Sequence, residues 1–153
     1  MIIVSGTHRS GTSLWMQILI AAGFEHIGEA FPRNADGVLR QANPLGFFES
    51  RLAAGVNFQT NPDPESGEYL FPDQTEAHAV KIFLTGLVRT DVAFIDRAIV
   101  TVRPWREFVS SLARLHRITG QEEIADEIAL HPVLTWWTQN FAAIRDIATR
   151  RYP

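Results

Sequence analysis

Short apolar runs alternate along the chain with longer segments in which hydrophobic residues recur at helical spacing. The apolar runs, rich in β-branched residues, predict buried strands at residues 1–5, 79–84 and 98–103. The helical spacing predicts helices at residues 11–23, 104–119 and 132–150, and a further helix is expected between the second and third strands. This alternation predicts an α/β fold with a mainly parallel sheet and one domain over residues 1–153.

The hydrophobic positions of the helices also predict which face each helix buries. In the first helix Leu14, Ile18 and Ala21 form one stripe, and Gly23 ends the helix. The stripe of the second helix comprises Trp105, Phe108, Val109, Leu112, Leu115 and Ile118. In the last helix the expected inward residues are Trp136, Phe141, Ile144 and Ile147, and the expected outward residues are Arg145, Arg150 and Arg151.

The segment from Glu25 to Asp73 lacks a regular pattern because five prolines interrupt it. One helical piece is expected at residues 50–59. Long irregular segments in compact domains are usually functional or mobile, so we expect this segment to face a substrate or to act as a lid.

Composition narrows the classes of function. Charged residues make up 20% of the chain and hydrophobic residues 46%, which is typical of a globular protein. The net charge of −3 predicts no general attraction for nucleic acid or for an anionic membrane. We find no apolar stretch long enough to span a bilayer and no signal peptide at the start, so a cytoplasmic protein is expected. Cysteine is absent, which excludes disulfides and thiolate metal sites.

A glycine loop follows the first predicted strand. Gly6 and Gly11 enclose four residues and precede Thr12 and Ser13, which is the spacing of a phosphate-binding P-loop with threonine in place of the lysine. Arg9 supplies a cation inside the loop. Glycines that let backbone amides wrap an anion, placed before a helix N-terminus, predict an anion site. The alternative is a plain glycine-serine turn between a strand and a helix.

A second cation lies at the end of the third predicted strand. There Arg103 stands where nucleotide-hydrolysing enzymes carry a magnesium-binding carboxylate, so we expect a second phosphate and no metal. Ser111 follows eight residues later and could share that anion. The alternative is that Arg103 pairs with a nearby carboxylate such as Glu107 or Asp96.

These motifs together resemble the sulfotransferase family, whose members use 3′-phosphoadenosine 5′-phosphosulfate (PAPS). GTHRSGTSLWMQIL resembles the family's 5′-phosphosulfate loop, IVTVRPWREFVSSLARL its 3′-phosphate motif, and NPLGFFES a stretch that bacterial members carry between the two. The resemblance covers residues 1 to about 115. It implies a three-layer α/β/α fold of P-loop type and sulfuryl transfer that yields 3′,5′-ADP without a metal.

The resemblance also implies roles for individual residues. Arg9 matches the loop cation that contacts the bridging oxygen, and Arg103 and Ser111 match the pair that binds the 3′-phosphate. The expected cradle of the 5′-phosphate comprises His8, Arg9, Ser10, Gly11, Thr12 and Ser13.

The resemblance offers several candidates for the residue that removes the acceptor proton. Cytosolic members carry Lys-x-His in the strand before the 3′-phosphate motif, and this chain keeps Lys81 but has Phe83 in place of the histidine. Other branches use a glutamate, for which Glu29 and Glu49 are the candidates by position. Weaker candidates are Glu25, Asp73 and His78.

Family members continue past a helix like that at 132–150 into a further strand and a loop that closes on the nucleotide. This sequence ends at Pro153, so we expect the domain to lack both. Two other functions remain open, namely a small P-loop kinase and a nucleotide-binding protein without turnover. The acceptor is expected to be a small molecule or glycan with a hydroxyl or amine, and the sequence does not indicate an oligomeric state.

Overall fold

A four-stranded parallel sheet lies at the centre of the computed structural model, which describes residues 1–31, 37–141, 145 and 149. Its strands are β1 (Ile2–Gly6), β2 (His26–Ile27), β3 (Ala79–Phe83) and β4 (Arg97–Thr101). Their order across the sheet is β2-β3-β1-β4, and all pairs are parallel. The predicted α/β class with a parallel sheet is therefore confirmed, and β4 ends two residues before Arg103.

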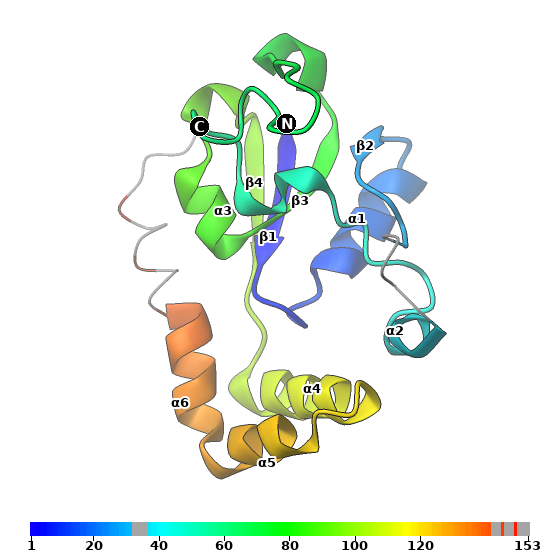
Figure 1. The fold of residues 1–153 in the computed structure, drawn as a ribbon, viewed down its shortest axis with the longest axis vertical. Coiled ribbons are helices and arrows are strands. Elements are labelled where there is room, and N and C mark those ends of the chain that lie inside the picture. The colour runs from blue at the N-terminus through cyan, green and yellow to red at the C-terminus, as the bar shows by residue number, and fades with distance from the viewer. Residues whose placement is uncertain (32–36, 142–144, 146–148, 150–153) are drawn as a thin grey trace.

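The two faces of the sheet bury different sets of residues because successive side chains of a strand point to opposite faces. On one face Ile3, Val80 and Ile82 belong to a cluster of buried apolar side chains that also includes Leu87 of α3 (Leu84–Arg89). On the other face Val4 and Ala79 pack with Met16, Leu19 and Phe48. Figure 1 shows α1 (Thr12–Ala21) and α3 on opposite sides of the strands.

Helix α1 has the predicted extent but buries a different face. Its buried residues are Thr12, Met16 and Leu19, whereas Leu14 and Ile18 are about half exposed, at 58% and 46%. The predicted stripe is therefore wrong. Because Thr12 follows directly on the glycine loop and is buried beside it, the loop fixes the rotation of the helix about its axis.

The irregular segment contains less helix than expected at residues 50–59 and an unexpected helix before it. That helix is α2 (Gly37–Ala42), and the later piece is only a 3-10 turn, Arg51–Ala54. The turn ends because Gly55, with φ of 98°, lies directly against the backbone of Gly86, where no side chain would fit. Two further 3-10 turns are Pro72–Thr75 and Val92–Phe94.

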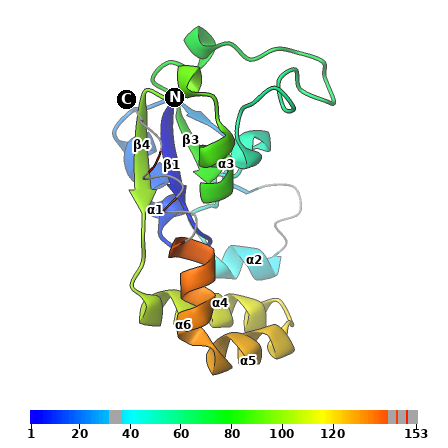
Figure 2. The same cartoon turned by 90° about the vertical axis from the view of Figure 1, so that its left-hand side faces the viewer.

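Three helices gather below the carboxyl ends of the strands, as both ribbon views show (Figures 1 and 2). They are α4 (Trp105–Ile118), α5 (Glu122–Leu130) and α6 (Pro132–Trp136), followed by a π-helical turn, Trp137–Phe141. Helix α4 matches the prediction, and α5 was not predicted. The helix expected at 132–150 is confirmed over residues 132–141, although its second half is π-helical, and Ile144, Ile147, Arg150 and Arg151 lie outside the described residues.

Helices α4 and α5 share an apolar cluster of their own, which comprises Phe108, Val109, Leu112, Ala113, Ala125 and Ile128. Trp105, expected in the stripe, is 37% exposed instead, because it stands at the first turn of α4. Within the part of the chain that the structure describes, no helix has the length and apolarity needed to cross a membrane.

Candidate functional site

The glycine loop turns sharply between β1 and α1. The backbone N–H and the hydroxyl of Ser10 both donate to the carbonyl of Thr7, at 3.2 and 2.7 Å. Arg9 has φ of 64° and Gly11 has φ of 101°, so two left-handed residues reverse the chain within the loop. Gly6 is closely packed, since a Cβ there would overlap the hydroxyls of Ser10 and Thr101. The loop thus rests directly on the end of β4.

The start of α1 faces a cleft with a volume of about 520 Å³. Gly11, Thr12 and Ser13 line it, and the described residues place no hydrogen-bond acceptor against the backbone N–H groups of Thr12 and Ser13. Free N–H groups and the positive end of the helix dipole favour an anion at such a position.

The two sequence motifs meet at this edge of the sheet. The Nε of Arg9 donates to the hydroxyl of Ser111 at 3.0 Å, and the Nη1 of Arg103 donates to the carbonyl of Arg9 at 3.1 Å. Burial lowers the pKa of Arg9, and the positive charges of Arg103 and Arg114 lower it further. Cations held this close together create a strongly positive site at the cleft.

Arg103 also pairs with Glu107, one of the two carboxylates that the sequence offered as alternative partners. Its Nε lies 3.2 Å from the carboxylate of Glu107, one turn along α4, while Asp96 pairs with the amino group of Met1 at 2.7 Å instead. The Arg103 side chain is 35% exposed and the Glu107 side chain 62% exposed. An exposed pair of this kind is weak, so it leaves Arg103 able to bind a phosphate.

Lys81 occupies a buried position on β3, on the same face of the sheet as Val4. Its Nζ donates to the carbonyl of Phe47 at 2.9 Å and to Oε1 of Glu49 at 3.3 Å. Burial lowers the pKa of Lys81, and the carboxylate of Glu49 opposes this effect. The hydroxyl of Ser13 shares the Phe47 carbonyl at 3.3 Å. Lys81 therefore links the segment around Glu49 to the sheet, and Ser13 links the same segment to the start of α1.

The carboxylate candidates differ in their position relative to the cleft. Glu49 lines it, whereas Glu29 is exposed and is not among the described lining residues, although the backbone N–H of Glu29 donates to the carbonyl of Glu49 at 3.0 Å. Glu25 pairs with His78 at 3.0 Å, and neither lines the cleft. Asp73 is exposed in the turn Pro72–Thr75.

His8 and Phe83, which both line the cleft, form an aromatic pair, and the His8 side chain is exposed. Their ring centroids are 4.4 Å apart. Loss of hydration lowers the pKa of His8. The carboxylate of Glu49 raises this pKa, and the positive charges of Lys81 and Arg9 lower it. A neutral His8 is therefore expected near pH 7. The described residues hold no group of three carboxylate or histidine side chains that could bind a metal ion.

Some residues of the site were not predicted. Leu39, Ala42 and Leu45 line the cleft from α2 and the loop after it, which lies near the carboxyl ends of the strands (Figure 2). The sequence predicted that their proline-interrupted segment faces a substrate, but it did not single out these three residues. Asn140, which is fully buried and contacts the loop, had no sequence signal at all.

Comparison with known proteins adds no relative to this picture. No family model matches the chain, and neither a curated protein nor a solved structure matches it. The function of this chain is therefore inferred from its residues and their geometry.

Proposed function

We propose that the protein is a sulfotransferase that moves a sulfuryl group from PAPS to a hydroxyl or amine acceptor. The proposal includes the three-layer P-loop arrangement, with the nucleotide at the glycine loop and the carboxyl ends of the strands. In this proposal the products are 3′,5′-ADP and the sulfated acceptor, and no metal takes part.

The contact between Arg9 and Ser111 carries the proposal. These residues lie far apart in the sequence, in the two motifs expected to bind the 5′ and 3′ phosphates, and yet they are 3.0 Å apart beside Arg103. A nucleotide that bears separated anions needs two cationic groups next to free backbone amides. A magnesium-dependent kinase would need a lysine at Thr12 and a strand-terminal carboxylate, and this chain has neither at those positions.

The same geometry suggests a role for each group during transfer. The acceptor oxygen forms a bond to sulfur while the bond from sulfur to the 5′-phosphate oxygen breaks, and that oxygen keeps the electron pair. Arg9 and the amides of Thr12 and Ser13 stabilise the negative charge that grows on the phosphate. The acceptor proton goes to Glu49, the carboxylate that lines the cleft, and Lys81 orients that carboxylate.

Nucleotide titration tests the proposal. Isothermal calorimetry in EDTA is expected to show binding of 3′,5′-ADP that is much tighter than binding of 5′-AMP. A transfer assay with labelled PAPS and a panel of hydroxyl and amine acceptors, small molecules and glycans, then measures turnover. Glu49→Gln is expected to lose turnover and keep nucleotide binding, with Glu29→Gln as the matched control.

Three other outcomes would contradict the proposal. Equal affinity for the two nucleotides would remove the 3′-phosphate site. Tight binding of ATP only with magnesium would indicate a kinase. Binding of 3′,5′-ADP without transfer to any acceptor would indicate a nucleotide-binding protein without turnover.

A further inference from the structure

Asn140 joins the C-terminal part of the chain to the glycine loop. It is fully buried in the π-helical turn after α6. Its Oδ1 accepts a hydrogen bond from the hydroxyl of Thr7 at 2.9 Å, and its Nδ2 donates to the carbonyl of Trp136 at 2.9 Å. A buried amide is costly unless both its ends are bonded, and here both are. Thr7 is the residue whose carbonyl holds Ser10 in the loop.

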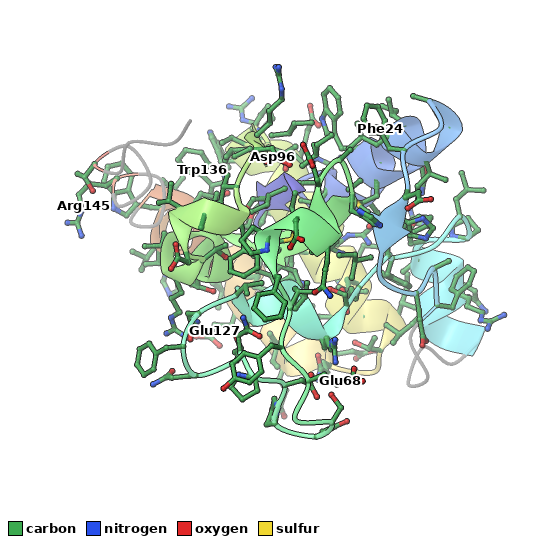
Figure 3. All side chains as sticks on the ribbon, turned by 90° about the horizontal axis from the view of Figure 1, so that it is seen from above. Phe24, Glu68, Asp96, Glu127, Trp136 and Arg145 are labelled. Carbon is green, nitrogen blue, oxygen red and sulfur yellow. The ribbon has the colours of Figure 1, made fainter. Side chains whose placement is uncertain are left out.

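Trp136 makes the corresponding contact to the second motif. Its indole N–H donates to the carbonyl of Arg103 at 2.8 Å, and its ring packs against the apolar cluster of α4 and α5. In the view from above, Trp136 and Phe24 lie on opposite sides of the strands, on the α6 side and the α1 side respectively (Figure 3). The C-terminal segment thus holds the backbone at Arg103 from the side opposite α1.

These contacts form a chain of hydrogen bonds that begins and ends in the glycine loop. Thr7 binds Asn140, Asn140 binds Trp136, Trp136 binds Arg103, and Arg103 binds the carbonyl of Arg9, two residues from Thr7. Arg9 adopts a left-handed conformation that is unfavourable for a residue with a side chain. External contacts are therefore needed to keep the loop in this shape before an anion binds.

We infer that Trp136 and Asn140 are positioning residues that hold the two phosphate-binding motifs at a fixed separation. The inference rests on the proposed nucleotide site and adds to it a role for the C-terminal segment. The physical reason is preorganisation, since a loop and an arginine already held in the binding geometry lose less conformational entropy when the nucleotide arrives. The two residues act on different motifs, so their effects on nucleotide selectivity differ.

Thr7→Val tests the link to the loop, because valine keeps the shape of threonine and removes the hydroxyl. Loss of one such hydrogen bond is expected to weaken both 3′,5′-ADP and 5′-AMP by about 2- to 12-fold and to leave their ratio unchanged. Thr7→Ser is expected to restore the wild-type affinity. Thr138→Val is the control, since among the described residues the hydroxyl of Thr138 bonds to carbonyls of the neighbouring helix α6 and not to the loop. A double-mutant cycle with Asn140→Ala is expected to be non-additive.

Trp136→Phe tests the link to Arg103, since it removes the indole N–H and keeps an aromatic ring. It is expected to lower the preference for 3′,5′-ADP over 5′-AMP by about 2- to 12-fold and to change 5′-AMP binding little. Trp137→Phe, at a half-exposed neighbour, is the matched control.

The outcomes separate this inference from the proposed function. A wild-type protein that does not prefer 3′,5′-ADP contradicts the proposed function itself. A wild-type preference that is unchanged in Thr7→Val and Trp136→Phe overturns the inference alone. Variants with a lower melting temperature and unaltered nucleotide affinities show that the segment only stabilises the fold, which also overturns it. The Thr7–Asn140 and Trp136–Arg103 hydrogen bonds are tested by separate variants. If one variant does not fold, the other still tests the inference.

Discussion

Removing the guanidinium of Arg103 is the perturbation that most directly tests the 3′-phosphate site. Two of its nitrogens are engaged in the structure, Nε with Glu107 and Nη1 with the carbonyl of Arg9. The remaining N–H groups of the fork are those available to a phosphate. Arg103→Ala is therefore expected to weaken 3′,5′-ADP binding more than 5′-AMP binding, because 5′-AMP has no 3′-phosphate for this side chain to contact.

The exposure of Arg103 sets the size of the effect. A hydrogen bond to a charged group contributes about 1.5–3 kcal/mol, and a side chain that is 35% exposed belongs near the lower end of that range. We expect a loss of about 2 kcal/mol, which is roughly a 25-fold fall in the preference for 3′,5′-ADP over 5′-AMP. Arg103→Lys restores only part of this preference, since an ammonium cannot reproduce the planar fork.

Replacing Glu107 is expected to change the affinity for 3′,5′-ADP in the opposite direction, which provides a second test of the same site. Its carboxylate competes with the nucleotide for Arg103 and repels the 3′-phosphate, and exposed ion pairs contribute about 0.2–1 kcal/mol. Glu107→Gln is thus expected to tighten 3′,5′-ADP binding by about 1.4- to 5-fold. Calorimetry of each variant with both nucleotides measures these changes, and Arg106→Ala, an exposed arginine of the same helix turn, is the control. An unaltered preference in Arg103→Ala would refute the assignment.

Three further expectations concern the loop and its neighbours. Arg9→Ala is expected to abolish transfer while 3′,5′-ADP binding weakens by only a few kcal/mol, and equal losses in the two assays would show a ground-state contact instead. Because the pKa of His8 is lowered, the unfolded chain takes up a proton first as pH falls below its usual value of about 6.5, so stability is lost on acidification. His8→Gln should then show a smaller fall in melting temperature between pH 7.5 and 5.5 than the wild type, and an identical fall would contradict this cause. Gly6→Ala is expected to cost about 1–3 kcal/mol in urea unfolding, since its Cβ overlaps Ser10 and Thr101, and an unchanged midpoint would mean that the loop is not packed on β4.

Strands β1, β3 and β4 could be predicted because each contains an apolar run rich in β-branched residues, whereas the two-residue strand β2 lies in the irregular segment and was not predicted. The buried face of α1 could not, because Leu14, Trp15, Met16, Ile18 and Leu19 make the helix apolar almost all round. A helix without a distinct polar face does not indicate which of its faces packs against the sheet. The buried position of Thr12, directly after the glycine loop, selects the face of the helix that is buried.

The site was predictable where it depends on the sheet and unpredictable where it depends on irregular chain. Carboxyl ends of parallel strands meet at one edge, so Arg9 and Arg103 could be expected to lie near each other from their places after two strands. Glu29 and Glu49 both lie in irregular segments, and only the fold shows which of them faces the cleft. Asn140 could not be found because its partner, Thr7, stands at the other end of the chain.

The position of β1 in the sheet has a consequence for how the chain folds. Ile2 pairs with both Ala79 and Arg97, so the central strand is joined to neighbours that are made much later in synthesis. Closing such long loops is slow, because chain entropy is lost before the pairing contacts form. Helices α4 and α5, by contrast, are adjacent in sequence and share an apolar cluster. We therefore expect this helical pair to form early and the sheet late, so that the glycine loop reaches its final shape only in the last stage of folding.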